Sequence, residues 1–424
     1  MKLFSFVILL FCFLNSSSQI DYGSFFIDRS LRFDYTIGGN SKESHVFTNQ
    51  FKQEPFWGGS QINLIDTFNF GDFKIMVYDS ASNRLLYSRG YSSLYYEWLD
   101  TDEADITYRS FQESVVFPFP KNSIKVDILM RNKQTIFNTI YSTYINPNSY
   151  LIIKDCFKEY PIKQLRYSRD HHKALDIVII PDGYTKSEMD KFHKDCNRFI
   201  GYFFNVEPFK SYENKINFWA VDAASPESGT DIPGNNIWKN TVLNSHFHTF
   251  GTDRYLTTQC IEKLRDIAGH VPYDQIYILV NTKEYGGGGI YNYYNLCSSD
   301  HSESEKVFSH EFGHAFAALA DEYEYGYEKA EDIYDMSVEP WQVNITNLVD
   351  FEKKWKHMVD KNTPVPTPSN STYTNKIGAF EGAGYVTEKI YRPANDCKMR
   401  SNYTDQFCPI CFQTIVKLLE FYTE

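Results

Sequence analysis

The sequence predicts two parts, an antiparallel β-sandwich followed by an α/β domain, and three observations support this fold class. Short segments of alternating apolar and polar residues dominate as far as about residue 150. From about residue 175, apolar runs alternate with helical patterns. The 424 residues suffice for two or three domains of about 100–200 residues each. We therefore expect a β-sandwich over residues 19–150 and a domain of α/β or α+β character over residues 151–424.

The first eighteen residues have the pattern of a secretory signal peptide. Lys2 precedes an apolar run over residues 3–14, and Asn-Ser-Ser-Ser follows at 15–18. The run is shorter than the roughly 20 residues that span a bilayer. We predict cleavage before Gln19 and a mature protein that is secreted, periplasmic or at the cell surface, with no membrane span. A retained N-terminal anchor is the alternative.

The net charge excludes one large class of partners. Lysine and arginine number 42 against 54 acidic residues, which gives a net charge of −12, and no basic block stands out. Nucleic-acid binding depends on clustered positive charge, so we expect no nucleic-acid partner.

The N-terminal part has the period of two that strands require. β-Branched apolar residues recur with a period of two at 75 and 77 and at 124, 126 and 128, and a turn-like segment lies at 79–83. Asn-Pro-Asn-Ser at 146–149 is the predicted linker. This pattern is typical of an antiparallel sandwich.

Strands and helices then alternate along the second part. The apolar run at 175–180 predicts a strand buried on both faces. Thr185 and Glu188 form a predicted capping box for a helix over residues 189–203. Further strands are expected at 216–220 and 275–280, separated by a helix over 256–267. The β-α-β-α-β order predicts an α/β sheet.

The motif His-Glu-Phe-Gly-His at residues 310–314 predicts a metal site. Two histidines four positions apart share one face of a helix, so both imidazoles can bind one Zn²⁺. Glu311 can then act as the general base toward metal-activated water. Ser302 and Glu305 form the predicted capping box of this helix. The alternative is a structural helix with two surface histidines.

Beyond this motif, the chain resembles the IgA-specific metalloendopeptidase family, relatives of the metzincins. The resemblance lies in residues 310–323, in Trp-Ala-Val-Asp at 219–222 with Ser-Gly-Thr-Asp at 228–231, in the glycines at 286–289, and in residues 391–400. Residues 22–35 resemble the start of the N-terminal domain found in Bacteroides-type members. The resemblance implies a metzincin-like zinc-peptidase domain with Glu311 as the base. It also implies that Met399 lies in a tight turn beneath the metal.

The third metal ligand departs from the metzincin pattern. Metzincins carry a glycine three residues after the second histidine and a ligand at six, and here those positions are Ala317 and Ala320. The nearest residues able to bind metal are Asp321 and Glu322. We predict Asp321, which requires the helix to end near residues 318–319. Glu322 and a remote residue such as His357 are the alternatives.

Other residues are candidates for substrate binding. The four glycines at 286–289 lack the helix and lysine of a phosphate loop. Gly287 and Gly288 are therefore expected on an irregular edge strand that pairs with an extended peptide, with a purely structural turn as the alternative. Tyr385, Tyr403, Arg392 and Arg400 are candidates to assist the oxyanion or the substrate terminus.

Seven of the eight cysteines lie after residue 18. Proximity in the sequence favours a disulfide from Cys397 to Cys408 or Cys411. Cys196 and Cys260 are expected to be buried free thiols on helix faces. Cys-Pro-Ile-Cys at 408–411 is a weak zinc or redox motif, because the sequence shows no second pair.

These observations predict a secreted zinc endopeptidase that cleaves extracellular proteins, including host or immunoglobulin-like proteins. One alternative is a zinc-containing adhesion or glycan-binding protein without catalysis. Another is a zinc amidase that acts on non-protein amides.

Overall fold

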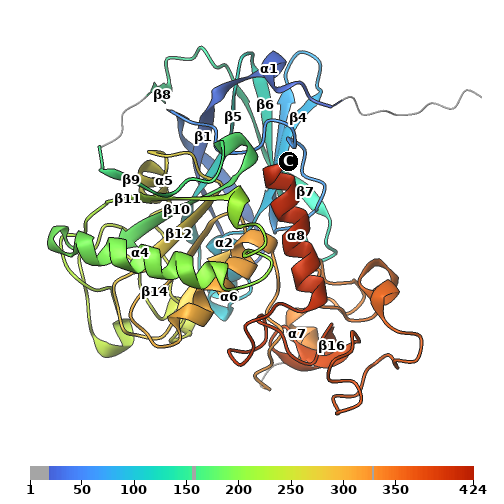
Figure 1. Cartoon of the computed structure of the whole chain (residues 1–424). Helices are drawn as coiled ribbons and strands as arrows, with labels where there is room; N and C mark the ends of the chain where they lie inside the picture. Colours follow the sequence, from blue (N-terminus) through green and yellow to red (C-terminus); the bar gives the residue numbers. More distant parts are fainter. Residues whose placement is uncertain (1–18, 155–158, 327–328) are drawn as a thin grey trace, which may run out of the picture.

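The computed structural model describes residues 19–154, 159–326 and 329–424 (Figure 1). The predicted signal peptide and Cys156 lie outside the described residues. Among the residues described, no helix is both long and apolar enough to cross a membrane.

The N-terminal part contains two four-stranded sheets, with strand orders β5-β1-β2-β8 and β4-β3-β6-β7. Neighbouring strands are antiparallel, except that β8 runs parallel to β2. The predicted alternating segments coincide with β3 and β6. The strands are β1 (Phe26–Gly39), β2 (Ser44–Glu54), β3 (Phe73–Asp79), β4 (Leu85–Tyr91), β5 (Arg109–Pro120), β6 (Ile124–Arg131), β7 (Phe137–Ile145) and β8 (Ile152–Lys154). Three short helices accompany them, α1 (Tyr22–Phe25), α2 (Leu94–Leu99) and α3 (Asp102–Ile106).

A mixed six-stranded sheet forms the centre of the second part, in the order β13-β14-β12-β10-β11-β9. The four inner strands are parallel, and the two edge strands are antiparallel to their neighbours. The predicted strands at 175–180, 216–220 and 275–280 are confirmed as β10, β11 and β12. The strands are β9 (Ile162–Arg166), β10 (Leu175–Asp182), β11 (Ile216–Val221), β12 (Gln275–Val280), β13 (Gly287–Ile290) and β14 (Tyr294–Ser298).

Both faces of this sheet are buried, because successive residues of β10 enter different cores. Ile177 and Ile179 join a cluster with helices α4 (Met189–Phe204), α6 (Ser304–Ala317) and α8 (Pro409–Thr423). Val178 and Ile180 join a second cluster, which includes α5 (Ile261–Ala268) and the N-terminal sheets. One hydrophobic core therefore extends across residue 150. The sandwich arrangement and the domain boundary stay predictions, and β8 lies beyond that boundary.

Helix α8 connects distant parts of the chain. In Figure 1 it runs, in red, from the region of β16 up to the N-terminal strands. Near its end, Phe421 packs edge-on against Phe68 with 5.2 Å between ring centroids, and the Arg89 guanidinium lies 4.7 Å from the Phe421 ring. The helix therefore ties the end of the second part to the first.

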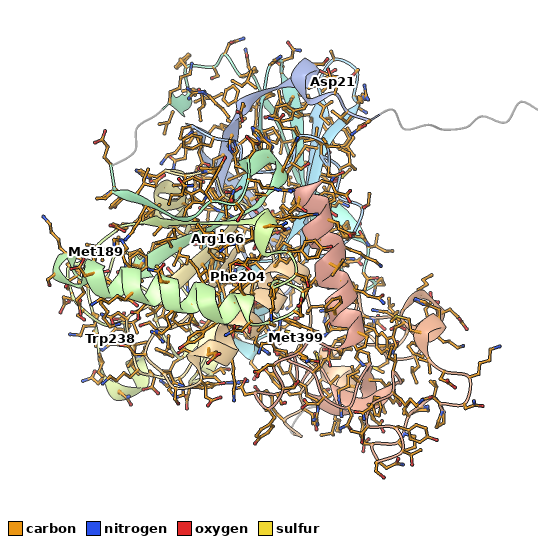
Figure 2. The ribbon with its side chains drawn as sticks, in the orientation of Figure 1. Asp21, Arg166, Met189, Phe204, Trp238 and Met399 are labelled. Carbon is orange, nitrogen blue, oxygen red and sulfur yellow. The ribbon has the colours of Figure 1, made fainter. Side chains whose placement is uncertain are left out.

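Two helix starts differ from the prediction. The Thr185–Glu188 capping box is present and precedes α4, whose first and last residues are labelled in Figure 2. Helix α5 begins only at Ile261, because Tyr255 and Thr257 form β-bridges to Gly287 and His246. The predicted Ser302 capping box is wrong. Helix α6 begins at Ser304, and its N-cap residue, Glu303, makes no side-chain cap.

The segment after α6 contains the short helix α7 (Ala330–Ile333) and a hairpin of β15 (Phe380–Ala383) and β16 (Val386–Arg392). Single turns of 3-10 helix complete the fold. They are η1 (His171–Lys173), η2 (Lys186–Glu188), η3 (Glu213–Lys215), η4 (Pro233–Asn235), η5 (Thr249–Gly251), η6 (Phe351–Lys353) and η7 (Lys356–Met358).

Candidate active site

Helix α6 carries His310, Glu311 and His314 and ends at Ala317 without a glycine or proline. Ala318 adopts the left-handed conformation, with φ 53°, and its N–H donates to the His314 carbonyl at 2.9 Å. This conformation costs an L-residue roughly 1–2 kcal/mol, and here the surrounding contacts maintain it. The turn sends the chain back along the helix and brings Asp321 to the two histidines.

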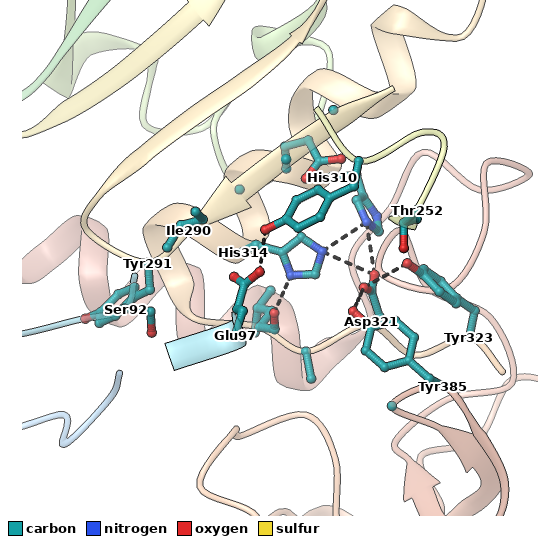
Figure 3. A pocket seen from close by; sticks show the side chains of 18 of the residues that line it. Ser92, Glu97, Thr252, Ile290, Tyr291, His310, His314, Asp321, Tyr323 and Tyr385 are labelled. Carbon is teal, nitrogen blue, oxygen red and sulfur yellow. Dashed lines mark hydrogen bonds and ion pairs between the residues drawn. The ribbon is translucent and has the colours of Figure 1, made fainter. Parts of the chain in front are cut away.

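The side chains of His310, His314 and Asp321, here called the histidine cluster, converge on one point (Figure 3). Nε2 of His310 lies 3.1 Å from Nε2 of His314 and 3.1 Å from Oδ1 of Asp321. Nε2 of His314 lies 3.2 Å from the same oxygen. Zn–N distances of about 2.0–2.1 Å imply separations of about 3.3–3.4 Å between ligands of a tetrahedral site. The three atoms are therefore spaced as zinc ligands are.

The far sides of these side chains are held by hydrogen bonds. Nδ1 of His310 lies 2.9 Å from the Lys398 carbonyl, and Nδ1 of His314 lies 2.6 Å from the Leu319 carbonyl. A carbonyl only accepts, so each Nδ1 carries a proton, and in the neutral imidazole the lone pair is then on Nε2. The tautomers therefore fit a metal.

Asp321 is oriented by two tyrosines. Its Oδ2 accepts hydrogen bonds from the hydroxyls of Tyr323 at 2.8 Å and Tyr385 at 2.6 Å. Its buried Oδ1 has no hydrogen-bond partner within the described part of the chain. An orphaned carboxylate oxygen that faces two lone pairs is costly unless a cation lies between them. The donor set therefore fits a divalent metal such as zinc.

The charges of the site influence one another strongly. Burial lowers the pKa of the His314 imidazole, but the Asp321 carboxylate outweighs burial and raises this pKa to about 9. Burial raises the pKa of Asp321, yet the two histidines hold it well below its usual range. Burial also raises the pKa of Glu311, against the effect of the histidines. Asp321 is thus an anion at neutral pH, and Glu311 has increased proton affinity.

Glu311 and the histidine cluster line a pocket of about 710 Å³. Gly287 and Gly288 line the same pocket on edge strand β13. A Cβ atom on Gly287 would lie 2.7 Å from Glu311 Oε1, and one on Gly289 would lie 2.2 Å from the Glu311 carbonyl oxygen. The glycines therefore let β13 approach α6 closely. The Gly287 carbonyl already accepts a hydrogen bond from Leu256 N–H, so part of this strand edge is paired within the chain.

Met399, labelled in Figure 2, is fully buried in a turn closed by a hydrogen bond from Arg400 N–H to the Cys397 carbonyl. Its sulfur lies against Gly313 of α6, where a Cβ atom would be 2.6 Å away. Gly313 lies between the two histidines in the sequence. The methionine therefore packs against the helix that carries His310 and His314.

Several candidate residues lie away from the pocket. Arg392 is buried and donates to the carbonyls of Glu381 and Gly382. Tyr403 is 97% exposed and does not line the pocket. His357 is exposed on η7, and Glu322 is fully buried outside the histidine cluster. Of the substrate-binding candidates, Gly287, Gly288, Tyr385 and Arg400 line the pocket.

Sequence reasoning missed three pocket residues. Tyr323 could have been found, because it lies only two residues from Asp321 in the sequence. Arg254 donates to the Tyr323 hydroxyl at 3.0 Å, and Glu97 of α2 accepts from the Tyr255 hydroxyl at 2.5 Å. The last two come from distant segments, so no local signal marked them. Glu97 shows that the N-terminal part contributes to the pocket wall (Figure 3).

The predicted disulfide from Cys397 to Cys408 or Cys411 is wrong. All six cysteines in the described ranges are free thiols. Cys196 is buried on α4 as predicted, whereas Cys260 is half-buried and precedes the first residue of α5. Sγ of Cys397 lies 3.9 Å from Sγ of Cys411, whereas a disulfide requires about 2.05 Å. Proximity in the sequence correctly predicted that these cysteines lie close together, but no disulfide joins them.

Two models of known protein families match the chain. A sequence model described as IgA peptidase M64 matches residues 163–376 and 369–419. A second, described as the peptidase M64 N-terminus, matches residues 21–142. No curated protein matches the chain.

Proposed function

Since the chain belongs to the IgA peptidase M64 family and is therefore a peptidase that acts on protein substrates, we propose that it is a secreted zinc-dependent endopeptidase with Glu311 as its general base. The observation that carries this proposal is the convergence of two Nε2 atoms and one orphaned carboxylate oxygen within 3.2 Å, beside Glu311 in one pocket. The apolar run at residues 3–14 supports export.

His310, His314 and Asp321 would hold the zinc. Three protein ligands are the number usual for a hydrolytic zinc, which leaves a position open toward the pocket. A bound zinc supplies Lewis acidity, which polarises the substrate carbonyl and lowers the pKa of water to about 7. Tyr323 and Tyr385 keep Asp321 in place, and the carbonyls of Lys398 and Leu319 keep the imidazoles in place.

Glu311 would move the proton. It sits next to His310 in the sequence and faces the pocket from the same helix. Its raised pKa suits a group that takes a proton from the attacking water and gives it to the leaving amine nitrogen. The close contact with Gly287 restricts where the carboxylate can lie. A substrate backbone would run along Gly287 and Gly288, with Tyr323 and Tyr385 on the opposite wall.

Substitution of Glu311 by Gln tests the assignment. We expect the rate of casein cleavage to fall by about 10²–10⁴-fold, the usual contribution of a general base, while the zinc content stays unchanged. A chelator should abolish cleavage by the wild type, and added zinc should restore it.

The matched control is Glu305→Gln, an exposed position on the same helix, which should retain full activity and zinc. Near-normal hydrolysis by Glu311→Gln would show that another group is the base. Cleavage that survives complete zinc removal would refute the metal-dependent mechanism.

A further inference from the structure

Four side chains from three segments meet in the core behind the pocket. They are Cys397 from the Met399 turn, Cys408 and Cys411 from the start of α8, and Glu322 from the segment after α6. Each offers one ligand atom, and these atoms all lie within 4.8 Å of one another. We call this set the cysteine cluster. None of its members lines the pocket.

The cluster is sealed from solvent. Cys397, Cys411 and Glu322 are fully buried, and Cys408 is 4% exposed. Oε1 of Glu322 lies 3.1 Å from Sγ of Cys411 and 3.8 Å from Sγ of Cys408. Its other oxygen, Oε2, has no hydrogen-bond partner among the described residues. A buried carboxylate with an unpaired oxygen requires a compensating positive charge or a proton.

The distances fit a metal bound by three sulfurs and one oxygen. Zn–S bonds of about 2.3 Å and Zn–O bonds of about 2.0–2.2 Å give tetrahedral separations of about 3.8 Å between sulfurs and about 3.6 Å between sulfur and oxygen. The observed separations are 3.9 Å for Cys397–Cys411 and 3.1 and 3.8 Å for the two contacts with Glu322. Cys408 and Cys411 also have the C-x₂-C spacing of zinc sites.

Several neighbouring groups stabilise negative charge on these sulfurs and oppose the effect of burial, which raises the pKa of Cys397 and of Cys411. The backbone N–H groups of Met399 and Cys408 donate to Sγ of Cys397 at 3.4 and 3.2 Å. Cys408 is the N-cap of α8 and Cys411 lies in its first turn, where the helix dipole stabilises negative charge. Asn344 donates to Glu322 Oε1 at 3.0 Å and orients the carboxylate.

We propose that Cys397, Cys408, Cys411 and Glu322 form a second, structural zinc site, separate from the histidine cluster. Folding brings Cys397 and Glu322 to the C-x₂-C motif and thus adds the two further ligands that the sequence does not place beside it. The bound zinc would join α8, the Met399 turn and the segment of Asp321 in a single crosslink. It would have four protein ligands and no open position, so its role is stability rather than catalysis.

Zinc content, measured by elemental mass spectrometry on the full-length mature protein, tests the proposal. We expect two equivalents in the wild type and one in the double variant His310→Ala/His314→Ala. The double variant Cys408→Ser/Cys411→Ser should also lose one equivalent. Cys196→Ala, a buried cysteine outside the cluster, is the matched control and should keep both.

Cobalt replacement identifies the ligands without relying on the cysteine variant, which could fail to fold. Co²⁺-loaded His310→Ala/His314→Ala should show the near-ultraviolet thiolate-to-cobalt charge-transfer band, because only the cysteine cluster remains. The absence of metal and of this band in that variant would overturn the proposal. A disulfide among these cysteines, found by non-reducing peptide mapping, would overturn it as well.

These outcomes are independent of the proposed function. If the histidine cluster bound no zinc, the wild type would hold one equivalent, and the histidine variant would keep it together with the charge-transfer band. If the cysteine cluster bound none, the histidine variant would hold no metal, while wild-type peptidase activity would still depend on zinc.

Discussion

The histidine cluster and the cysteine cluster begin at neighbouring residues, Asp321 and Glu322, yet they provide opposite environments. Both residues lie in the segment after α6, outside any strand, and their side chains reach different partners. The Asp321 carboxylate meets two imidazoles at the wall of a pocket of about 710 Å³. The Glu322 carboxylate meets two thiols in the closed core.

The difference shows how the surroundings determine what two neighbouring carboxylates can do. Three protein ligands beside a cavity leave one position for a reactant, whereas four ligands in the core leave none. Nitrogen and oxygen donors keep a zinc strongly Lewis acidic, and three thiolates neutralise much of its charge. On our two proposals, adjacent residues of one chain contribute to a reactive metal site and to an inert one.

The largest effect should come from removing the negative charge of Asp321, and the same change at its neighbour Glu322 provides the comparison. Asp321→Asn removes the anionic ligand, so we expect turnover to fall by more than the 10–100-fold typical of outer-shell partners, with loss of one zinc equivalent. Glu322→Gln should keep turnover within a few-fold and weaken only the second metal. Casein hydrolysis and zinc content, measured on the same samples, separate the two.

Each variant serves as the control for the other, because both are isosteric and lie one residue apart. If Glu322→Gln lost turnover as completely as Asp321→Asn, the two clusters would not be functionally distinct. If Asp321→Asn kept both metals, the third ligand would have to be another residue.

An intermediate effect is expected for Tyr385→Phe. The Tyr385 hydroxyl donates to Oδ2 of Asp321 at 2.6 Å, so its removal loosens a ligand without deleting it. We expect zinc affinity of the histidine cluster to fall about 10–100-fold, measured by competition with a chromophoric chelator. The charge-transfer band of the cysteine cluster should not change.

Tyr403→Phe is the control for this measurement, since that hydroxyl is exposed and outside the pocket. It should leave both affinities unaltered. An equal loss in both tyrosine variants would indicate a general change in the fold, and no loss in Tyr385→Phe would show that Tyr323 alone suffices to orient Asp321.

The smallest effect concerns Glu113, a buried carboxylate outside both clusters. Burial raises the pKa of Glu113 from 4.5 to about 8 in the folded protein. The folded state thus retains a proton that the unfolded chain releases near pH 4.5, so the free energy of unfolding falls as the pH rises from 5 to 8. We expect Glu113→Gln to remove part of this fall, because an amide does not ionise.

The measurement is the difference in urea midpoint between wild type and Glu113→Gln at pH 5.5 and pH 8.5. Taking this difference cancels the pH dependence of metal binding that both proteins share. If the urea midpoint of Glu113→Gln differed from that of the wild type by the same amount at pH 5.5 and at pH 8.5, Glu113 would not carry the proton.

Much of the fold followed from local patterns. Strands β10 and β12 are buried throughout and largely apolar because the sheet is covered on both faces, and such runs are easily recognised. The Thr185–Glu188 capping box lies within four residues of sequence, so it too was visible. The false box at Ser302 failed because a hydroxyl and a glutamate at the right spacing do not fix where a helix starts. Tertiary contacts placed the start of α6 at Ser304, whose hydroxyl donates to the Ser298 carbonyl.

The site was predictable where its residues share one helix and unpredictable where they do not. The histidine spacing indicated the cluster, and the need for a third ligand pointed to Asp321. The helix end at Ala318 has no sequence signal, because its left-handed conformation is imposed by packing rather than by a glycine. Glu97 reaches the pocket from more than 200 residues away, and Cys397 meets Glu322 only after the chain has folded.

The carbonyl of Lys398 orients the imidazole of His310 although 88 residues separate the two in the sequence. This separation determines when, during synthesis, the histidine cluster can form. During synthesis His310, Glu311 and His314 leave the ribosome long before Lys398 does. Until that later segment arrives, the first imidazole has no carbonyl to set its orientation, and α6 lacks the methionine beneath it. We therefore expect the histidine cluster to reach its final geometry only as this last segment folds into place.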